Sequence, residues 1–161
     1  MVWASFSLYS CSDLVVMQRD IDAPRGGYTA RSYIAVLDEI LPQIYEEGYT
    51  IFQQDNAPIH TAHLTQEWFE RHGIEVIRWP PYSPDLNPIE HLWHHLKILL
   101  QQHYNHLFDL PKGSQRLKDE MAKALKECWP QISNVIRYNC AASMVDRVKA
   151  VIKARGWYTP Y

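Results

Sequence analysis

The chain has 161 residues, a net charge of −2 and 47% hydrophobic residues, so one domain with a substantial core is expected. No apolar run approaches the roughly 20 residues that cross a membrane, and Asp13 interrupts the opening segment too early for a signal peptide. The three cysteines are odd in number and lack metal-ligand spacing, which indicates a reduced, intracellular protein.

The first 54 residues predict strand, strand, helix and strand. Apolar runs at residues 1–7 and 14–18, with turn residues between them, predict a hairpin. After a loop, Thr29 is the expected cap of a helix that ends at Gly48. Residues 50–54 (TIFQQ) begin with β-branched and aromatic side chains and then turn polar, as a buried strand does at the edge of its sheet. The helix keeps apolar residues at a helical period: Tyr33, Val36, Leu37, Ile40, Leu41 and Ile44.

Asp55 directly follows this strand, and open α/β sheets place their ligands at the carboxyl ends of strands. A purely structural role is open as well, because an aspartate before Asn56-Ala57-Pro58 can bond its own backbone in an Asx turn. Next come a predicted helix at Thr61–His72 closed by Gly73, a strand at Ile74–Trp79, and a proline-rich turn at residues 80–84.

Glu90 lies at the start of another predicted helix. In NPIE, residues 87–90, Asn87 is the expected N-cap and Pro88 the first helical residue, and Glu90 can reach back to the cap amide. A purely structural role, capping the start of this helix, therefore stays open for Glu90 as well. The helix has one apolar stripe, made of Ile89, Leu92, Trp93, Leu96, Leu99 and Leu100.

Two further helices are predicted after a polar continuation at residues 101–110 and a break at 111–113. The first opens at Ser114, with Leu117, Met121, Ala124, Leu125 and Cys128 on one face. The second runs from about Ile132 to Arg155, with a stripe of Ile136, Cys140, Met144, Val148, Val151 and Ile152. Both stripes are expected to pack against the sheet.

Charge is distributed unevenly along the chain. Residues 1–111 carry 6 Lys and Arg against 14 Asp and Glu, a balance of −8, and residues 112–161 carry 10 against 4, a balance of +6. The acidic part suits a region that gathers cations, and the basic helical part suits contact with phosphates. Attraction between the two parts is the alternative.

Two blocks separated by a fixed distance resemble a known family. QDNAPIH (residues 54–60), a strand ending in WP (79–80) and SPDLNPIEHLW (83–93) are similar to the second and third acidic blocks of mariner-superfamily DDE transposases. Between Asp55 and Glu90 lie 34 residues, which fits the branch whose third acid is Glu.

The resemblance implies an α/β, ribonuclease-H-like fold: a mixed sheet flanked by helices, with a helical C-terminal tail. Residues 1–111 would be a partial DDE catalytic domain and residues 112–161 its basic helical extension. In this family the sheet starts with one more strand, which is central and carries the first catalytic Asp. The chain begins after the matching position, so that strand and acid are expected to be absent.

The implied activity is Mg²⁺-dependent DNA cleavage and strand transfer in transposition. Mg²⁺ or Mn²⁺ would be bound by Asp55 and Glu90, with two ions in an intact family member. Asn56 and His60 would support these ligands or face DNA. The implied partner is DNA, as transposon ends and target, in the nucleus, with no membrane and no small-molecule cofactor; a homodimer is left open. Candidate contacts to the DNA backbone are Lys149, Lys153 and Arg155.

Three alternatives to an active domain stay open. With two acids where three are expected, catalysis by this chain alone is doubtful, so it could be a transposon remnant without chemistry. It could also be a co-opted module that binds DNA or protein through its basic tail. His91, His94 and His95 stand together, and His91 and His95 have the i, i+4 spacing of zinc-binding helices, although Leu92 stands where a zinc protease has Glu.

Overall fold

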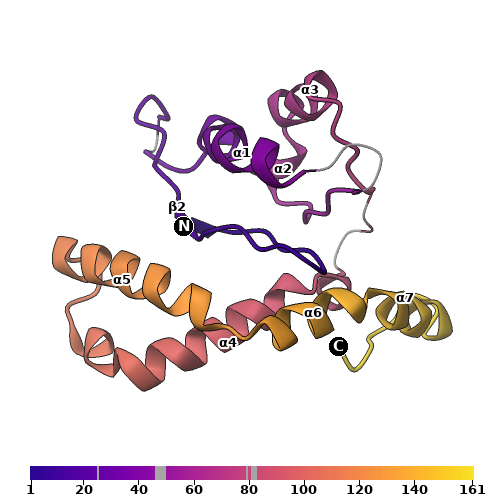
Figure 1. Ribbon diagram of the computed structural model, residues 1–161. Coiled ribbons are helices and arrows are strands. Elements are labelled where there is room, and N and C mark those ends of the chain that lie inside the picture. Colours follow the sequence, from indigo (N-terminus) through magenta and orange to yellow (C-terminus); the bar gives the residue numbers. More distant parts are fainter. Residues whose placement is uncertain (25, 46–49, 79, 81–82) are drawn as a thin grey trace. The chain divides into compact units, whose positions relative to one another are not determined.

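The protein is described by a computed structural model over residues 1–24, 26–45, 50–78, 80 and 83–161. Its elements fall into two compact units (Figure 1). The first consists of Met1–Trp3 and Val15–Ser83, and the second of Ala4–Leu14 and Pro84–Tyr161. None of the described helices is both long and apolar enough to cross a membrane.

The first unit contains the only ladder among the described residues, and it confirms the predicted pairing of the first two strands. β1 (Val2–Trp3) and β2 (Val15–Val16) are antiparallel, with Val2 opposite Val16 and Trp3 opposite Val15. Both strands are shorter than the apolar runs that predicted them.

The strands predicted at residues 50–54 and 74–79 meet at one parallel bridge, Phe52 to Val76, within the described residues. The Phe52 amide donates to the Glu75 carbonyl at 2.8 Å, and the Ile77 amide donates to the Phe52 carbonyl at 2.9 Å. Among the described residues, this bridge does not extend into a longer ladder. The strand end at Trp79 lies outside the described residues.

Helix α1 (Ala30–Ile44) confirms the helix predicted after Thr29. The Thr29 amide donates to Ser32 Oγ at 3.4 Å. Most of the expected stripe is buried, Ile40 and Ile44 are partly buried, and the stripe packs with residues of β1, β2 and α3 in the core of this unit. The predicted end at Gly48 lies outside the described residues. The buried members of this core are Trp3, Met17, Tyr33, Val36, Leu37, Leu41, Trp68, Phe69 and Ile74.

The helix predicted at Thr61–His72 is α3 (His63–Arg71), and a short helix that was not predicted, α2 (Pro58–Thr61), precedes it. Ala62 between them is extended, with φ −59° and ψ 141°, and starts α3 afresh. The predicted end at Gly73 is confirmed: its φ is +64°, and the Ile74 amide donates to the Phe69 carbonyl at 3.0 Å. This is the Schellman arrangement, in which glycine adopts the left-handed conformation at low cost.

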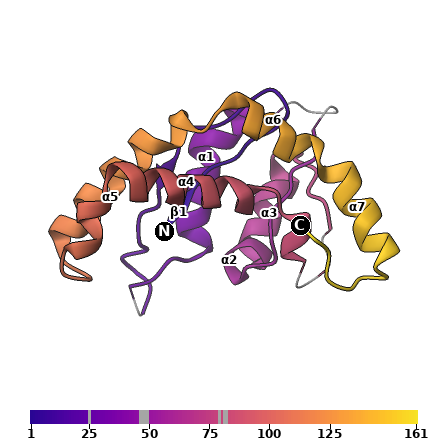
Figure 2. The ribbon, with the colours of Figure 1, turned by 90° about the horizontal axis from the view of Figure 1, so that it is seen from below.

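The second unit is built on α4 (Ile89–His103) and α5 (Gln115–Cys128), which lie side by side in Figure 1 and Figure 2. Before α4 stands the 3-10 helix η1 (Pro84–Leu86), and between α4 and α5 stands η2 (Asn105–Asp109). The predicted stripe of α4 is confirmed by buried Leu92, Leu96 and Leu100. Ser114 caps α5 as predicted, since its Oγ accepts from the Leu117 amide at 3.2 Å.

The last predicted helix is wrong as a single element. After η3 (Trp129–Gln131), the chain forms α6 (Asn134–Ala142) and α7 (Met144–Lys153), separated at Ser143. In the second half of the predicted stripe, Val148 is 41% and Ile152 70% exposed, whereas Met144 and Val151 are partly buried. Arg147 is buried instead, at 2% exposure.

The compact units divide at residues 83 and 84, whereas the charge balance changes near residue 111. The division into residues 1–111 and 112–161 therefore stays a prediction. All of the basic extension lies within the second unit, together with α4.

Candidate active site

Asp55 follows the Phe52 bridge by three residues, and its side chain is 53% exposed. Oδ1 accepts the Ala57 amide at 2.9 Å, which is the Asx turn that the sequence left open. The same oxygen is 2.6 Å from Nδ1 of His60, and Nδ1 donates in the tautomer that protonates it. An Asx turn does not require a histidine, so the carboxylate is held by more than its local turn.

His60 is itself held in place by the core of the first unit. Its ring lies against the ring of Tyr33, with centroids 4.4 Å apart and planes tilted by 42°. The Tyr33 hydroxyl donates to Gln54 Oε1 at 2.6 Å, and Gln54 Nε2 donates to the His60 carbonyl at 3.4 Å. Burial raises the pKa of the Tyr33 phenol well above its usual range, so it stays a donor. Buried residues thereby fix the histidine that contacts Asp55.

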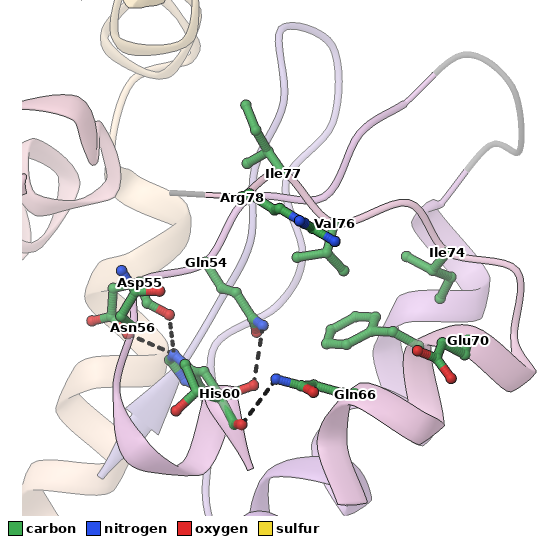
Figure 3. Close-up of a pocket in the computed structure, with 12 residues that line it drawn as sticks. Gln54, Asp55, Asn56, His60, Gln66, Glu70, Ile74, Val76, Ile77 and Arg78 are labelled. Carbon is green, nitrogen blue, oxygen red and sulfur yellow. Dashed lines mark hydrogen bonds and ion pairs between the residues drawn. The ribbon is translucent and has the colours of Figure 1, made fainter. Parts of the chain in front are cut away.

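A pocket of about 480 Å³ opens beside Asp55 (Figure 3). Asn56 and His60 line it on the Asp55 side, and Val76, Ile77 and Arg78 come from the segment that bridges to Phe52. It is open and mixed in character, with an apolar wall and a polar rim. The remaining lining residues are Gln54, Thr61, Gln66, Phe69, Glu70 and Ile74.

The oxygens of Asp55 fit a hard divalent cation. Oδ2 accepts no hydrogen bond from any residue that the structure describes, and the carboxylate is half exposed at the rim of the pocket. Carboxylate oxygen is the ligand type that Mg²⁺ and Mn²⁺ take in proteins. Within the described ranges, no three His, Cys, Asp or Glu side chains gather as a metal-binding group. Asp55 thus offers one ligand rather than a complete site.

Glu90 stands in the first turn of α4 and is exposed. Its amide donates to the Asn87 carbonyl at 3.2 Å, and the cap residue is Pro88, one position later than predicted. The Asn87 side chain does not cap the described helix, so the predicted capping box is wrong. Asp55 belongs to the first unit and Glu90 to the second, and their convergence on one metal stays a prediction.

The three histidines at the start of α4, His91, His94 and His95, are not part of any metal-binding group among the described residues. The pKa of His91 is lowered, first by burial and then by the positive charges of Arg147, His94 and His95. The rings of His94 and His95 have centroids 6.1 Å apart. The lack of such a group among the described residues favours ordinary surface histidines over a zinc site.

The three basic residues proposed to follow DNA are all exposed: Lys149 and Lys153 lie in α7, and Arg155 lies just after it. Lys149 Nζ lies 3.5 Å from Asp146 Oδ1, an exposed pair that solvent weakens. Arg155 has a φ of +55°, the only described non-glycine residue in the left-handed region. Their exposure fits contact with a large anionic partner.

Two residues that matter to the site were missed from the sequence. Tyr33 supports His60, but its position in the apolar stripe of α1 predicted a plain core residue. Arg147 is buried and donates to the Asp85 carbonyl just before α4, but it lies outside the predicted apolar stripe. Tyr33 contacts His60, and Arg147 contacts Asp85. Both partners lie far along the chain, so the spacing of apolar residues in a helix cannot predict these contacts.

Comparison with known proteins places the chain in a family. The family of DDE superfamily endonucleases matches residues 24–109, a range that contains both Asp55 and Glu90. The transposase of transposable element Tc1 from Caenorhabditis elegans is 38% identical over 113 residues, covering 69% of this chain and 37% of that protein. The Tc3 transposase from the same organism is 34% identical over 105 residues, covering 65% and 30%. The chain thus spans about 37% of the length of the first of these relatives.

Solved structures show the same fold. The catalytic domain of Mos1 mariner transposase superposes with a TM-score of 0.61 at 23% identity, covering 81% of this chain and 64% of that one. A Mos1 catalytic domain solved with raltegravir and Mn gives a TM-score of 0.63 at 20% identity, covering 99% and 82%. The chain therefore belongs to the DDE superfamily endonucleases and has the ribonuclease-H-like α/β fold of a mariner transposase catalytic domain.

Proposed function

We propose that Asp55 and Glu90 bind Mg²⁺ or Mn²⁺ in a transposase catalytic domain that cleaves DNA and transfers strands. The observation that carries this proposal is the carboxylate of Asp55. It ends a bridged segment, keeps one oxygen free of described hydrogen bonds and stands at the rim of an open pocket. The family match spans this residue and Glu90.

Bound metal ions would activate an attacking oxygen and stabilise a leaving oxygen at phosphorus. The residues of this chain prepare that site. Asp55 supplies an anionic oxygen, and His60 fixes its direction through the 2.6 Å contact to Oδ1. Asn56 lines the same pocket, where its side chain can meet DNA. Such a protein would act on transposon ends and target DNA, in the nucleus, and as a dimer if the two ends are held together.

We further infer that this chain alone does not catalyse DNA cleavage efficiently. It contributes two matched acids, whereas an intact member of the resembling family uses three, and each lost carboxylate weakens both the affinity and the placement of a hard cation. Metal binding to the chain is then expected without efficient cleavage. Carboxylates beyond Asp55 and Glu90 would have to complete the site.

The encoding locus is first sequenced upstream of Met1 to look for an in-frame strand that ends in Asp. If that strand is found, a protein that includes it is used in the cleavage test. Supercoiled plasmid is incubated with it and Mn²⁺. Asp55→Asn is expected to lower the nicking rate by about a thousandfold, equivalent to losing several kcal/mol of transition-state stabilisation. Asp109→Asn, which removes an exposed carboxylate outside the site, serves as the matched control. Nicking that survives Asp55→Asn would overturn the proposal.

The alternatives predict different results. A remnant without chemistry would show neither nicking nor DNA binding. A co-opted module would bind DNA with a steep salt dependence that Asp55→Asn leaves unchanged, because that binding depends on phosphate contacts made by exposed lysines and arginines. The exposure of Lys149, Lys153 and Arg155 is the observation that keeps this second function open.

A further inference from the structure

Arg147 is a buried cation in α7 whose partners are neutral. Its side chain is 2% exposed, and its Nε donates to Ser143 Oγ at 2.8 Å. Nη1 donates to the backbone carbonyl of Asp85 at 2.5 Å. The guanidinium carbon lies 4.7 Å from the centre of the Tyr161 ring. No carboxylate of the described chain forms an ion pair with it, so its burial is costly unless these contacts are kept.

Asp85 is held a second time by the same terminal segment. The Thr159 hydroxyl donates to Asp85 Oδ2 at 2.8 Å. The main-chain carbonyl and the side-chain carboxylate of Asp85 are thus bound by residues 62 and 74 positions later in the chain. One residue with two distant partners is fixed in both position and orientation.

The segment that contains Asp85 leads directly into the helix that carries Glu90. Asp85 is the middle residue of η1, and Leu86 beside it is buried. The Asn87 amide donates to the Pro84 carbonyl at 2.9 Å, and the Glu90 amide donates to the Asn87 carbonyl at 3.2 Å. These bonds link η1 to the first turn of α4, so a contact that holds Asp85 acts close to Glu90.

We propose that Arg147 and Thr159, with Tyr161 packed against Arg147, form a clasp on Asp85 that sets the direction of Glu90, making all three positioning residues for the metal site. The metal part of this statement depends on the proposed function, whereas the clasp itself does not. Guanidinium is suited to the role because its planar donors can hold two acceptors at once. All of these residues belong to the second unit.

The first test is hydrogen exchange at the amides of Asn87, Glu90 and His91, measured by NMR. Arg147→Met keeps the length of the side chain and removes its donors. Exchange at these amides is expected to rise by about tenfold to a hundredfold, the change that loss of a charged hydrogen bond produces. Amides of α5 should not change. The matched control is Lys126→Met, which removes an exposed cation of α5.

Arg147→Met could destabilise the whole unit, so two milder variants accompany it. Thr159→Val removes only the hydroxyl that binds the Asp85 carboxylate, and Tyr161→Leu removes only the ring. Both are expected to speed exchange at the same three amides, each by less than Arg147→Met. Equal acceleration across the whole second unit in all three variants, or no change at residues 87–91, would overturn the clasp.

The second test asks whether the clasp serves the metal. Mn²⁺ added to the wild-type chain should broaden the amide signals of Ala57 and Glu90. In Arg147→Met, the broadening at Glu90 should be lost while that at Ala57 remains. Equal broadening of Glu90 in wild type and variant would overturn the positioning role. If Mn²⁺ broadens neither signal in the wild type, the metal proposal fails, and the exchange measurement still decides the clasp.

Discussion

At the scale of single residues, His60 adds a side-chain contact to Asp55 Oδ1 beyond the local Asx turn. His60→Ala removes the donor 2.6 Å from Asp55 Oδ1. The Mn²⁺ concentration at half-saturation is expected to rise about tenfold, the usual effect of losing a partner that orients a ligand. His60→Gln, which keeps a donor, should restore part of the affinity. Titration calorimetry measures both.

The control for this prediction is His63→Ala. His63 is exposed in α3 and its ring lies 3.3 Å from Glu67, away from Asp55. A thermal melt of each variant separates orientation from folding, because His60 also packs on Tyr33. Unchanged Mn²⁺ affinity in His60→Ala, alongside its loss in Asp55→Asn, would show that the histidine only supports the fold.

Asp20 predicts a pH dependence of stability. The pKa of Asp20 is lowered below 3.8, mainly by the hydrogen bond from the Thr29 hydroxyl at 2.6 Å. Burial opposes this effect, and contacts from Arg31 and the Asp22 amide lower the pKa further. A carboxyl group whose pKa is lower in the folded than in the unfolded state stabilises the protein at pH values above the unfolded-state pKa. That stabilisation is lost as the pH falls through the folded-state pKa.

Asp20→Asn should therefore lower the melting temperature at pH 7, and its difference from wild type should shrink as the pH falls below about 4. Thermal melts over that range measure it. Asp22→Asn is the control, because Asp22 is exposed and takes part through its backbone amide. A difference from wild type that is constant with pH would contradict this account.

At the scale of elements, α7 ends in a Schellman motif whose left-handed residue is Arg155 rather than glycine. The Gly156 amide donates to the Val151 carbonyl at 3.0 Å, and the Arg155 amide donates to the Ile152 carbonyl at 3.0 Å. A side chain at φ +55° is strained. Arg155→Gly is expected to stabilise the protein by about 0.5–1 kcal/mol in urea unfolding.

The same change should weaken DNA binding if Arg155 contacts phosphate. Stability would then rise while affinity falls, a combination that a purely structural residue does not give. Arg155→Lys keeps both the strain and the charge, and should leave both quantities near wild type. A Gly variant that binds DNA as well as wild type would remove Arg155 from the candidate contacts.

The elements that the sequence predicted well are those whose ends and faces are determined locally. Thr29 and Ser114 mark the starts of α1 and α5, and Gly73 marks the end of α3. The break at Ser143 was missed, and so was the burial of Arg147, whose hydrogen-bond partner Asp85 lies 62 residues away in the chain. Asp55 and His60 were named because both stand in the QDNAPIH block that resembles the family, whereas Tyr33 reaches His60 only through the fold.

At the scale of the whole molecule, the uneven charge predicts how DNA binding depends on salt. Replacing Lys149, Lys153 and Arg155 with Gln should reduce the slope of log affinity against log salt by about 2 to 3, since each phosphate contact contributes about 0.9. The control is a triple Gln variant of Lys112, Lys118 and Lys126, exposed residues of the same basic segment. Equal effects of both sets would indicate a general charge effect without a defined contact surface.

The second unit is assembled from two separated parts of the chain, residues 4–14 and 84–161. Trp129 Nε1 donates to the Ser12 carbonyl at 2.8 Å, a hydrogen bond that spans 117 residues and is buried. Contacts of such long range form slowly, because a large loop must close before they contribute. During synthesis, residues 4–14 must wait for Trp129 to leave the ribosome. Until then, Ser12 lacks its hydrogen bond from Trp129, and the second unit cannot be complete.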